Sequence, residues 1–197
     1  MSNSYVATAF VVTTTKAEAH LARLCFTASE LLGDGNETSA HASAILHDPL
    51  FAVTYPPLPT HADDPWSGFK TVFEDEDYFG LGCTIEVEPR ENGSVDLWIA
   101  GHQIQVETVA RVLQRSCPSA LPLAFEWACY SDRLRRDAFG GGYAIVAADH
   151  IQLVTTADLI GRALAGLNGI ADEHDQAIRY ARSHEADKGR DQRTDVA

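Results

Sequence analysis

Hydrophobic and polar positions change period along this chain, and each period predicts a type of element. Residues 4–15 are rich in β-branched and aromatic side chains with partial alternation, which is typical of a strand. Residues 16–32 instead place apolar side chains at i, i+3 and i+4 spacing, which predicts a helix. Thr15 and Glu18 have the spacing of a capping box, so we expect this helix to begin after Thr15.

The rest of the chain repeats these two periods. Strand-like segments are predicted at residues 81–88, 94–100, 121–130, 143–148 and 151–154. Asn92-Gly93 indicates a hairpin turn between the first two of these segments. Helical spacing is predicted at residues 105–117, 157–167 and 171–183.

The resulting order of elements is β-α-insertion-β-β-α-β-β-α. Two βα units around a central hairpin are typical of the split β-α-β arrangement of ferredoxin-like folds. We therefore expect a single α+β domain over residues 1–184, with helices on one face of a sheet. The other face of the sheet must then be covered by the insertion or by a partner, or it must carry polar side chains. Residues 185–197 are highly charged and are predicted to form a disordered tail.

Residues 36–80 form an insertion in which the periodicity weakens, although the apolar positions of residues 38–47 are compatible with a short helix. The run Tyr55-Pro56-Pro57-Leu58-Pro59 favours an extended, turn-rich backbone. A stretch of this length without clear periodicity is either a functional insertion or partly mobile. Its aromatic residues indicate that parts of it pack against the domain.

The distribution of charge gives this insertion a candidate role. The 197 residues include 28 acidic and 15 basic side chains, for a net charge of −13. Residues 62–96 hold ten acidic and two basic residues, a net −8, whereas residues 97–156 are neutral. The acidic balance argues against direct binding to nucleic acid or an anionic membrane, because Lys and Arg must supply that attraction. No apolar run approaches the roughly 20 residues that span a bilayer.

Acidic side chains beside aromatic ones predict a protein-binding surface in this region. Such a surface complements a basic groove on another protein, including a groove that normally receives nucleic acid. The alternative is a solvated acidic face that keeps the protein soluble. The candidate interaction residues are Asp63, Asp64, Trp66, Phe69, Phe73, Glu74, Asp75, Glu76, Asp77 and Tyr78.

A second candidate site lies in the C-terminal half, where a carboxylate, a basic cluster and a glycine run follow one another. Guanidinium groups bind carboxylates and phosphates, although neighbouring acids can also neutralise them. The glycines precede a strand rather than a helix, so a turn or a close backbone approach is favoured over a phosphate-binding loop. The residues of this site are Glu126, Arg133, Arg135, Arg136, Gly140, Gly141 and Gly142.

Cysteine and histidine are spaced for neither a metal site nor a disulfide framework. The four cysteines form no C-x-x-C pair, and the eight histidines form no H-x-x-x-H or H-E-x-x-H unit. We expect free core thiols in a reducing cytoplasm, with no metal and no cofactor.

One motif resembles a known group of proteins. Phe125-Glu126-Trp127-Ala128, then Arg133 or Arg136, then Phe139-Gly140-Gly141-Gly142, is similar to a loosely defined set of phage- and plasmid-borne accessory proteins. The resemblance covers about residues 80–160. It implies a mobile-element context and carries no catalytic residue with it. The acidic insertion and the C-terminal tail depart from the pattern.

These features favour a cytoplasmic accessory protein of a mobile element that binds another protein in the host cell. An anti-CRISPR-like inhibitor of a host defence complex is the specific form we expect. The alternative is an enzyme or small-ligand-binding protein that uses the open sheet face, with Glu126, Arg133 and Arg136 as its polar groups. A third is an oligomerisation module, and the sequence leaves the oligomeric state open.

Overall fold

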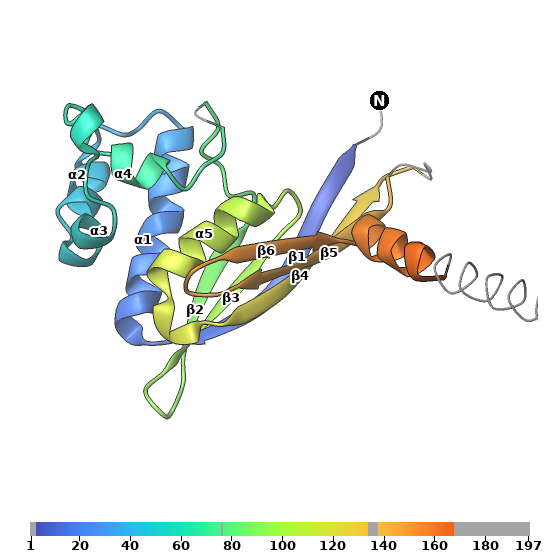
Figure 1. The fold of residues 1–197 in the computed structure, drawn as a ribbon. Helices are drawn as coiled ribbons and strands as arrows, with labels where there is room; N and C mark the ends of the chain where they lie inside the picture. The colour runs from blue at the N-terminus through green and yellow to red at the C-terminus, as the bar shows by residue number, and fades with distance from the viewer. Residues whose placement is uncertain (1–2, 76, 134–137, 168–197) are drawn as a thin grey trace, which may run out of the picture. The chain divides into compact units, whose positions relative to one another are not determined.

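A computed structural model of the chain describes residues 3–75, 77–133 and 138–167. The chain divides into two compact units, residues 1–155 and residues 156–197. The first unit is an α+β structure built on one open, six-stranded antiparallel sheet (Figure 1). The α+β class predicted from the hydrophobic pattern is therefore confirmed.

Each predicted strand segment overlaps an observed strand, but β2 begins three residues later than predicted and β5 begins three residues earlier. The sheet order is β2-β3-β1-β4-β5-β6, and every neighbouring pair of strands is antiparallel. This order is not that of a four-stranded ferredoxin-like sheet, because two further strands extend the sheet beyond β4. The strands are β1 Ser4–Thr14, β2 Thr84–Pro89, β3 Val95–Gly101, β4 Leu123–Ser131, β5 Gly140–Val146 and β6 Ile151–Thr155.

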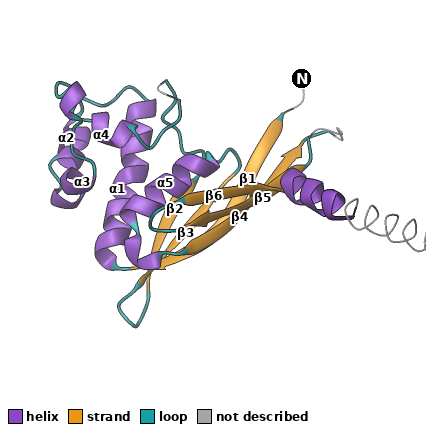
Figure 2. Cartoon of the chain, in the orientation of Figure 1, coloured by secondary structure: helices purple, strands orange, loops and turns teal. Residues whose placement is uncertain are grey.

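Two longer helices cover one face of this sheet (Figure 2). Helix α1 contacts β2 and β3, helix α5 contacts β5 and β6, and the two helices contact each other. Helix α1 begins as predicted, since Thr15 and Glu18 form a capping box. The α-helices of this unit are α1 Lys16–Gly33, α2 Ala40–Leu46, α3 Pro49–Thr54, α4 Ser67–Lys70 and α5 Val106–Ser116.

Alternate strand residues point into the core between the sheet and these helices. In β3, the predicted inward residues Val95, Leu97 and Ile99 are all buried. They pair with β1, so that Leu97 lies opposite Val12 and both lie in the core. Because side chains alternate along a strand, this register places the remaining residues of each strand on the opposite face. No described helix of residues 3–155 lies over that face, which we call the uncovered face.

Residues 36–80 fold into helices α2, α3 and α4, with a 3₁₀ turn at Pro59–His61. Helices α2 and α3 pack against α1. Aromatic rings from this segment lie within 6.4 Å of one another, centroid to centroid, and extend the core of the sheet along α1. The insertion is therefore a structural extension of the core.

The described part of the second unit is a helix over residues 156–167, as predicted for residues 157–167. Its large apolar side chains are between 41% and 63% exposed, namely Leu159, Ile160, Leu164 and Leu167. The predicted helix at residues 171–183 and the predicted tail at residues 185–197 lie outside the described residues.

Candidate functional site

The aromatic part of the predicted interaction surface belongs to the core. Trp66, Phe69 and Phe73 are 2%, 0% and 8% exposed, so they cannot contact a partner on the surface. The prediction that they form an exposed binding surface is wrong, because rings from α3 and α4 bury one another. Tyr78 is 48% exposed and remains available.

The acidic residues of the same segment are partly paired within the protein. Lys70 Nζ lies 2.8 Å from Asp64 Oδ2. Partial burial acts to raise the pKa of Asp64, but hydrogen bonds from Lys70 and the Trp66 backbone lower it overall. Glu74 lies 3.9 Å from Arg111, and its pKa is raised because it shares a hydrogen bond with the Glu107 carboxylate.

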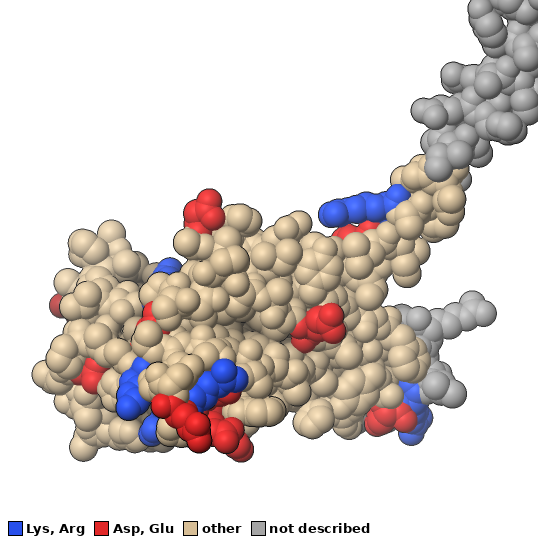
Figure 3. All heavy atoms as spheres, turned by 90° about the horizontal axis from the view of Figure 1, so that it is seen from below, with Lys and Arg blue, Asp and Glu red and all other residues tan. Residues whose placement is uncertain are grey.

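Three of the remaining candidate acids of this segment lie on the surface. Asp63, Asp75 and Asp77 are exposed, and Asp75 Oδ1 accepts a hydrogen bond from the Asp77 backbone. Glu76 lies outside the described residues. On the face drawn in Figure 3, acidic and basic side chains lie next to one another in some places, and acidic side chains stand alone in others.

The second predicted site is not brought together by the fold. Glu126 lies in β4, whereas Arg133 follows the end of that strand at Ser131. Five residues of extended strand place Glu126 about 16 Å from the end of β4, at roughly 3.3 Å per residue. Arg135 and Arg136 lie outside the described residues.

The triple glycine lies within strand β5 rather than in a turn. Gly142 pairs with Trp127 across the β4–β5 ladder. A Cβ on Gly142 would lie 2.2 Å from the Val154 carbonyl oxygen and 2.6 Å from the Trp127 ring. The expectation of a turn is wrong, but the close backbone approach that was also predicted is present. The glycines make room for the Trp127 ring, and a phosphate-binding role has no support here.

The sheet presents a different surface on the face opposite α1 and α5. Trp98 and Val11 lie opposite each other on this face and are 51% and 40% exposed. The nearest residues to this pair by register are Ala9, Thr13, Glu86, Asp96 and Ala100. The other members of this face are Tyr5, Ala7, Thr84, Glu88, Ala124, Glu126, Ala128, Tyr130, Tyr143 and Ile145, with Gln152 and the buried Val154 on β6. The uncovered face is thus largely apolar.

All the charged residues of the six strands are acidic, and all of them lie on this uncovered face. They are Glu86, Glu88, Asp96 and Glu126, while no strand contains Lys or Arg. Trp98 lies opposite Glu86, and its indole Nε1 donates to Glu88 at 3.2 Å. The face therefore combines an apolar middle with negative charge.

The four carboxylates differ in how they are paired. Asp96 accepts hydrogen bonds from Thr13 Oγ1 and Arg90 Nε, each at 2.6 Å. The hydrogen bond from Thr13, and then that from Arg90, lowers the pKa of Asp96. The carboxylates of Glu86 and Glu126 make no hydrogen bond or ion pair with any residue that the structure describes. Two of the four charges thus lie free on this face.

A shallow groove of about 460 Å³ interrupts the uncovered face between β1 and β4. The two strands pair only from Ser4 to Ala7, and beyond this point they separate. The groove is lined by Ala9, Phe10, Ala124, Phe125, Glu126, Tyr143 and Ile145. Glu126, from the second predicted site, thus lines a recessed surface.

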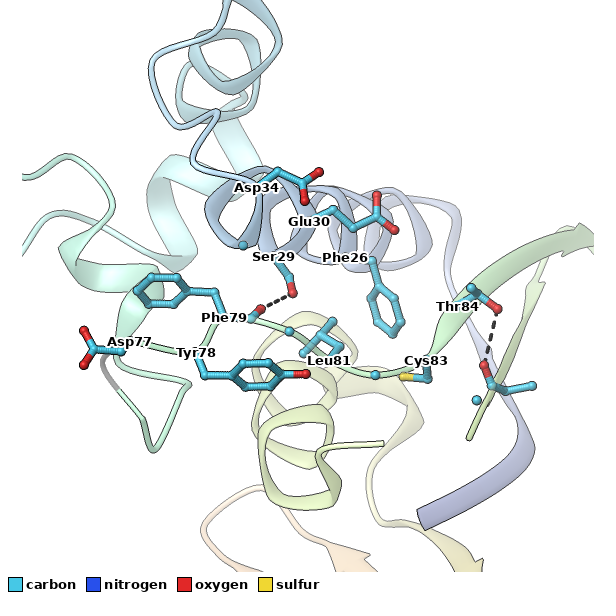
Figure 4. A pocket seen from close by; sticks show the side chains of 15 residues that line it. Phe26, Ser29, Glu30, Asp34, Asp77, Tyr78, Phe79, Leu81, Cys83 and Thr84 are labelled. Atoms are coloured by element: carbon cyan, nitrogen blue, oxygen red, sulfur yellow. Dashed lines mark hydrogen bonds between the residues drawn. The ribbon is translucent and has the colours of Figure 1, made fainter. Parts of the chain in front are cut away.

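A second cavity, of about 530 Å³, lies between the end of α1 and residues 77–84. Figure 4 shows Glu30 and Asp34 at this end of α1, beside the loop that carries Tyr78 and Phe79. Neither His nor Lys lines this cavity, and burial raises the pKa of the Cys83 thiol to about 12. The raised pKa favours the protonated thiol of Cys83 at neutral pH, which makes it a poor nucleophile.

The described ranges contain no group of three His, Cys, Asp or Glu side chains that could hold a metal ion. In the same ranges no helix is long and apolar enough to cross a membrane.

Sequence reasoning did not single out Trp98, Tyr143 or Val11. A usable signal existed for Trp98, because Leu97 and Ile99 were predicted to point inward and alternation then turns Trp98 outward. The groove had no such signal, since it depends on where β1 and β4 separate.

Comparisons of this chain with protein-family models, with curated proteins and with solved structures give no match.

Proposed function

We propose that this protein acts by binding another protein through the uncovered face of its sheet, and that the partner presents basic and apolar side chains. The observation that carries this proposal is the composition of that face. It exposes half of Trp98 and two unpaired carboxylates, and its strands contribute no basic residue.

The exposed aromatic and aliphatic side chains supply the attraction. An exposed Trp in an apolar patch gains free energy when a partner covers it, and Trp is among the residues that dominate binding energies. The carboxylates then select the partner, because opposite charges steer association and like charges repel. Two copies of this chain placed face to face would oppose acid to acid, so a second copy fits poorly.

A basic protein surface is the partner that this face fits best. Surfaces that normally receive nucleic acid are basic, so a nucleic-acid-binding complex of the host belongs to this class. We retain as a proposal a mobile-element accessory protein that acts as an anti-CRISPR-like inhibitor in the host cytoplasm. The motif that resembles such accessory proteins, Phe125–Ala128, lies in β4 and contributes Glu126 to the uncovered face.

We also infer a ferredoxin-like arrangement for the first four strands. The partial order β2-β3-β1-β4 supports it, with α1 between β1 and β2 in the chain and α5 between β3 and β4. Strands β5 and β6 then lengthen the sheet.

Charge reversal on the face tests the proposed function. Glu86→Lys adds a positive charge beside Trp98, whereas Glu91→Lys makes the same change in the β2–β3 turn, away from the face. The purified variants and the Trp98→Ala variant serve as bait in host lysate, and the captured protein is then purified and its affinity measured at several salt concentrations. We expect Glu86→Lys and Trp98→Ala to weaken binding at least tenfold and Glu91→Lys to leave it unchanged. Capture of the same proteins by all variants, or of none by the native chain, would overturn the proposal.

A further inference from the structure

We infer that the groove between β1 and β4 binds one cationic side chain of the partner, an arginine in preference to a lysine. This inference rests on the proposed function, because it assumes that a partner covers the uncovered face. The arginine in the groove is then the most deeply buried side chain of the partner in that interface.

The groove exists because β1 changes partners along its length. From Ser4 to Ala7 it pairs with β4, whereas from Thr8 to Thr14 it pairs only with β3. At the point of separation, Thr8 Oγ1 donates to the backbone carbonyl of Glu126 at 2.5 Å. This bond fixes the β4 backbone at the end of the groove.

The side chains that form the walls of the groove are apolar, and two of them are small. Ala9 on β1 and Ala124 on β4 leave room at the surface, and Ile145 adds an aliphatic wall. Phe10 and Phe125 stack with their ring centroids 4.4 Å apart and also line the groove. An aliphatic stem such as that of arginine can therefore lie in the groove without losing hydrogen bonds to water.

The polar end of the groove is suited to a cation. Glu126 and Tyr143 lie directly opposite each other across the β4–β5 ladder, and both line the groove. The Glu126 carboxylate has no partner among the described residues, so it is free to accept a bidentate hydrogen bond from a guanidinium group. An aromatic ring beside that carboxylate adds a cation–π contact, which a planar guanidinium makes better than an ammonium.

A pair of synthetic peptides provides the test. In one peptide apolar residues alternate with arginine. In the other peptide citrulline, an uncharged isostere of arginine, replaces each arginine. Affinities of the native chain and of Glu126→Gln are measured by calorimetry, with Glu91→Gln as the matched control at an exposed turn. Chemical-shift changes at Ala9, Ala124 and Ile145 locate the bound peptide.

We expect the arginine peptide to bind the native chain at least tenfold more tightly than the citrulline peptide. Glu126→Gln should remove most of this ratio, and Glu91→Gln should keep it. If Trp98→Ala weakens binding while Glu126→Gln leaves the ratio unchanged, the groove inference fails and the proposed function stands. If neither peptide binds the face, both fail. A dimer of the native chain that dissociates in Glu126→Gln would assign the groove to a second copy and would also overturn the inference.

Discussion

Glu18 illustrates how much a single carboxylate contributes to this fold. It accepts hydrogen bonds from the Thr15 backbone at 3.1 Å and the Ser119 backbone at 2.8 Å, and from the hydroxyls of Thr14, Thr15 and Ser119. Partial burial acts to raise its pKa, but these hydrogen bonds lower the pKa from 4.5 to about 2. Glu18 therefore joins the end of β1, the start of α1 and the turn after α5.

Replacing Glu18 by Gln should destabilise the protein at neutral pH by roughly 1–2 kcal/mol. The NH₂ group of Gln cannot accept the hydrogen bonds that the surrounding N–H and O–H groups donate to the carboxylate. The folded pKa lies below the unfolded value, so this contribution is complete above pH 4.5 and is lost as the pH falls towards 2. Urea unfolding at pH 7, 4 and 3 should show the difference between native and Glu18→Gln proteins shrinking with pH. A constant difference, or an equal loss in Glu91→Gln, would contradict this account.

At the scale of elements, the β4–β5 pair shows why strand β5 contains glycine at Gly141 and Gly142. Gly141 has a φ of 149°, and a Cβ there would lie 2.3 Å from the Trp127 carbonyl oxygen. Gly142 lies under the Trp127 ring. The Trp127 ring on β4 therefore occupies the space that a side chain at Gly142 on β5 would fill.

Gly142→Ala should lower the free energy of unfolding by about 1–3 kcal/mol, because the added methyl group overlaps the Val154 carbonyl and the Trp127 ring. Gly33→Ala is the control, since no atom lies within 4 Å of its Cβ position at the end of α1. There we expect no loss, or a small gain from reduced backbone entropy in the unfolded chain. Chemical denaturation measures both, and equal stabilities for the two variants would refute the packing argument.

At the scale of residues 1–155, the sheet and the inserted helices share one hydrophobic core. Helix α1 contacts the sheet and also α2 and α3. Trp66 packs against Phe51 and Phe69, and its indole Nε1 donates to the Glu37 carbonyl at 3.2 Å. The insertion should therefore unfold together with the sheet.

Trp66→Ala tests this coupling. Removing a fully buried Trp should cost about 3–5 kcal/mol and lower the midpoint of a single transition for the whole unit. Tyr78→Ala, at a half-exposed aromatic residue of the same segment, should change stability far less. Circular dichroism and hydrogen exchange at β3 report on the sheet. If exchange at β3 is unaffected by Trp66→Ala, the insertion is an independent unit.

The accuracy of the sequence-based predictions depended on the distance along the chain between the interacting residues. Thr15 and Glu18 are three residues apart, and their capping box was predictable. The inward positions of β3 were equally predictable, because alternation is a property of consecutive residues. The contact of Trp66 with Phe51 and that of Gly142 with Trp127 join residues separated along the chain. The aromatic residues indicated that parts of the insertion pack against the domain, but the sequence did not predict which residues meet.

The candidate site follows the same rule. The net charge of −13 and its concentration in residues 62–96 were visible in the sequence, but their arrangement was not. Folding pairs Asp64 with Lys70 and Asp96 with Arg90, and it leaves Glu86 unpaired beside Trp98. The number of charges along the sequence thus identifies an acidic region. The register of the sheet determines which of its carboxylates have no partner among the described residues.

Local periodicity and capping specify the α+β class, the approximate boundaries of most strands and the start of α1, so these could be read from the amino-acid sequence. Contacts between distant residues place the aromatic residues of the insertion in the core, pack Gly142 under the Trp127 ring and separate β1 from β4 to form a groove. Strand order and register bring these residues together, and no local pattern specifies which of them meet.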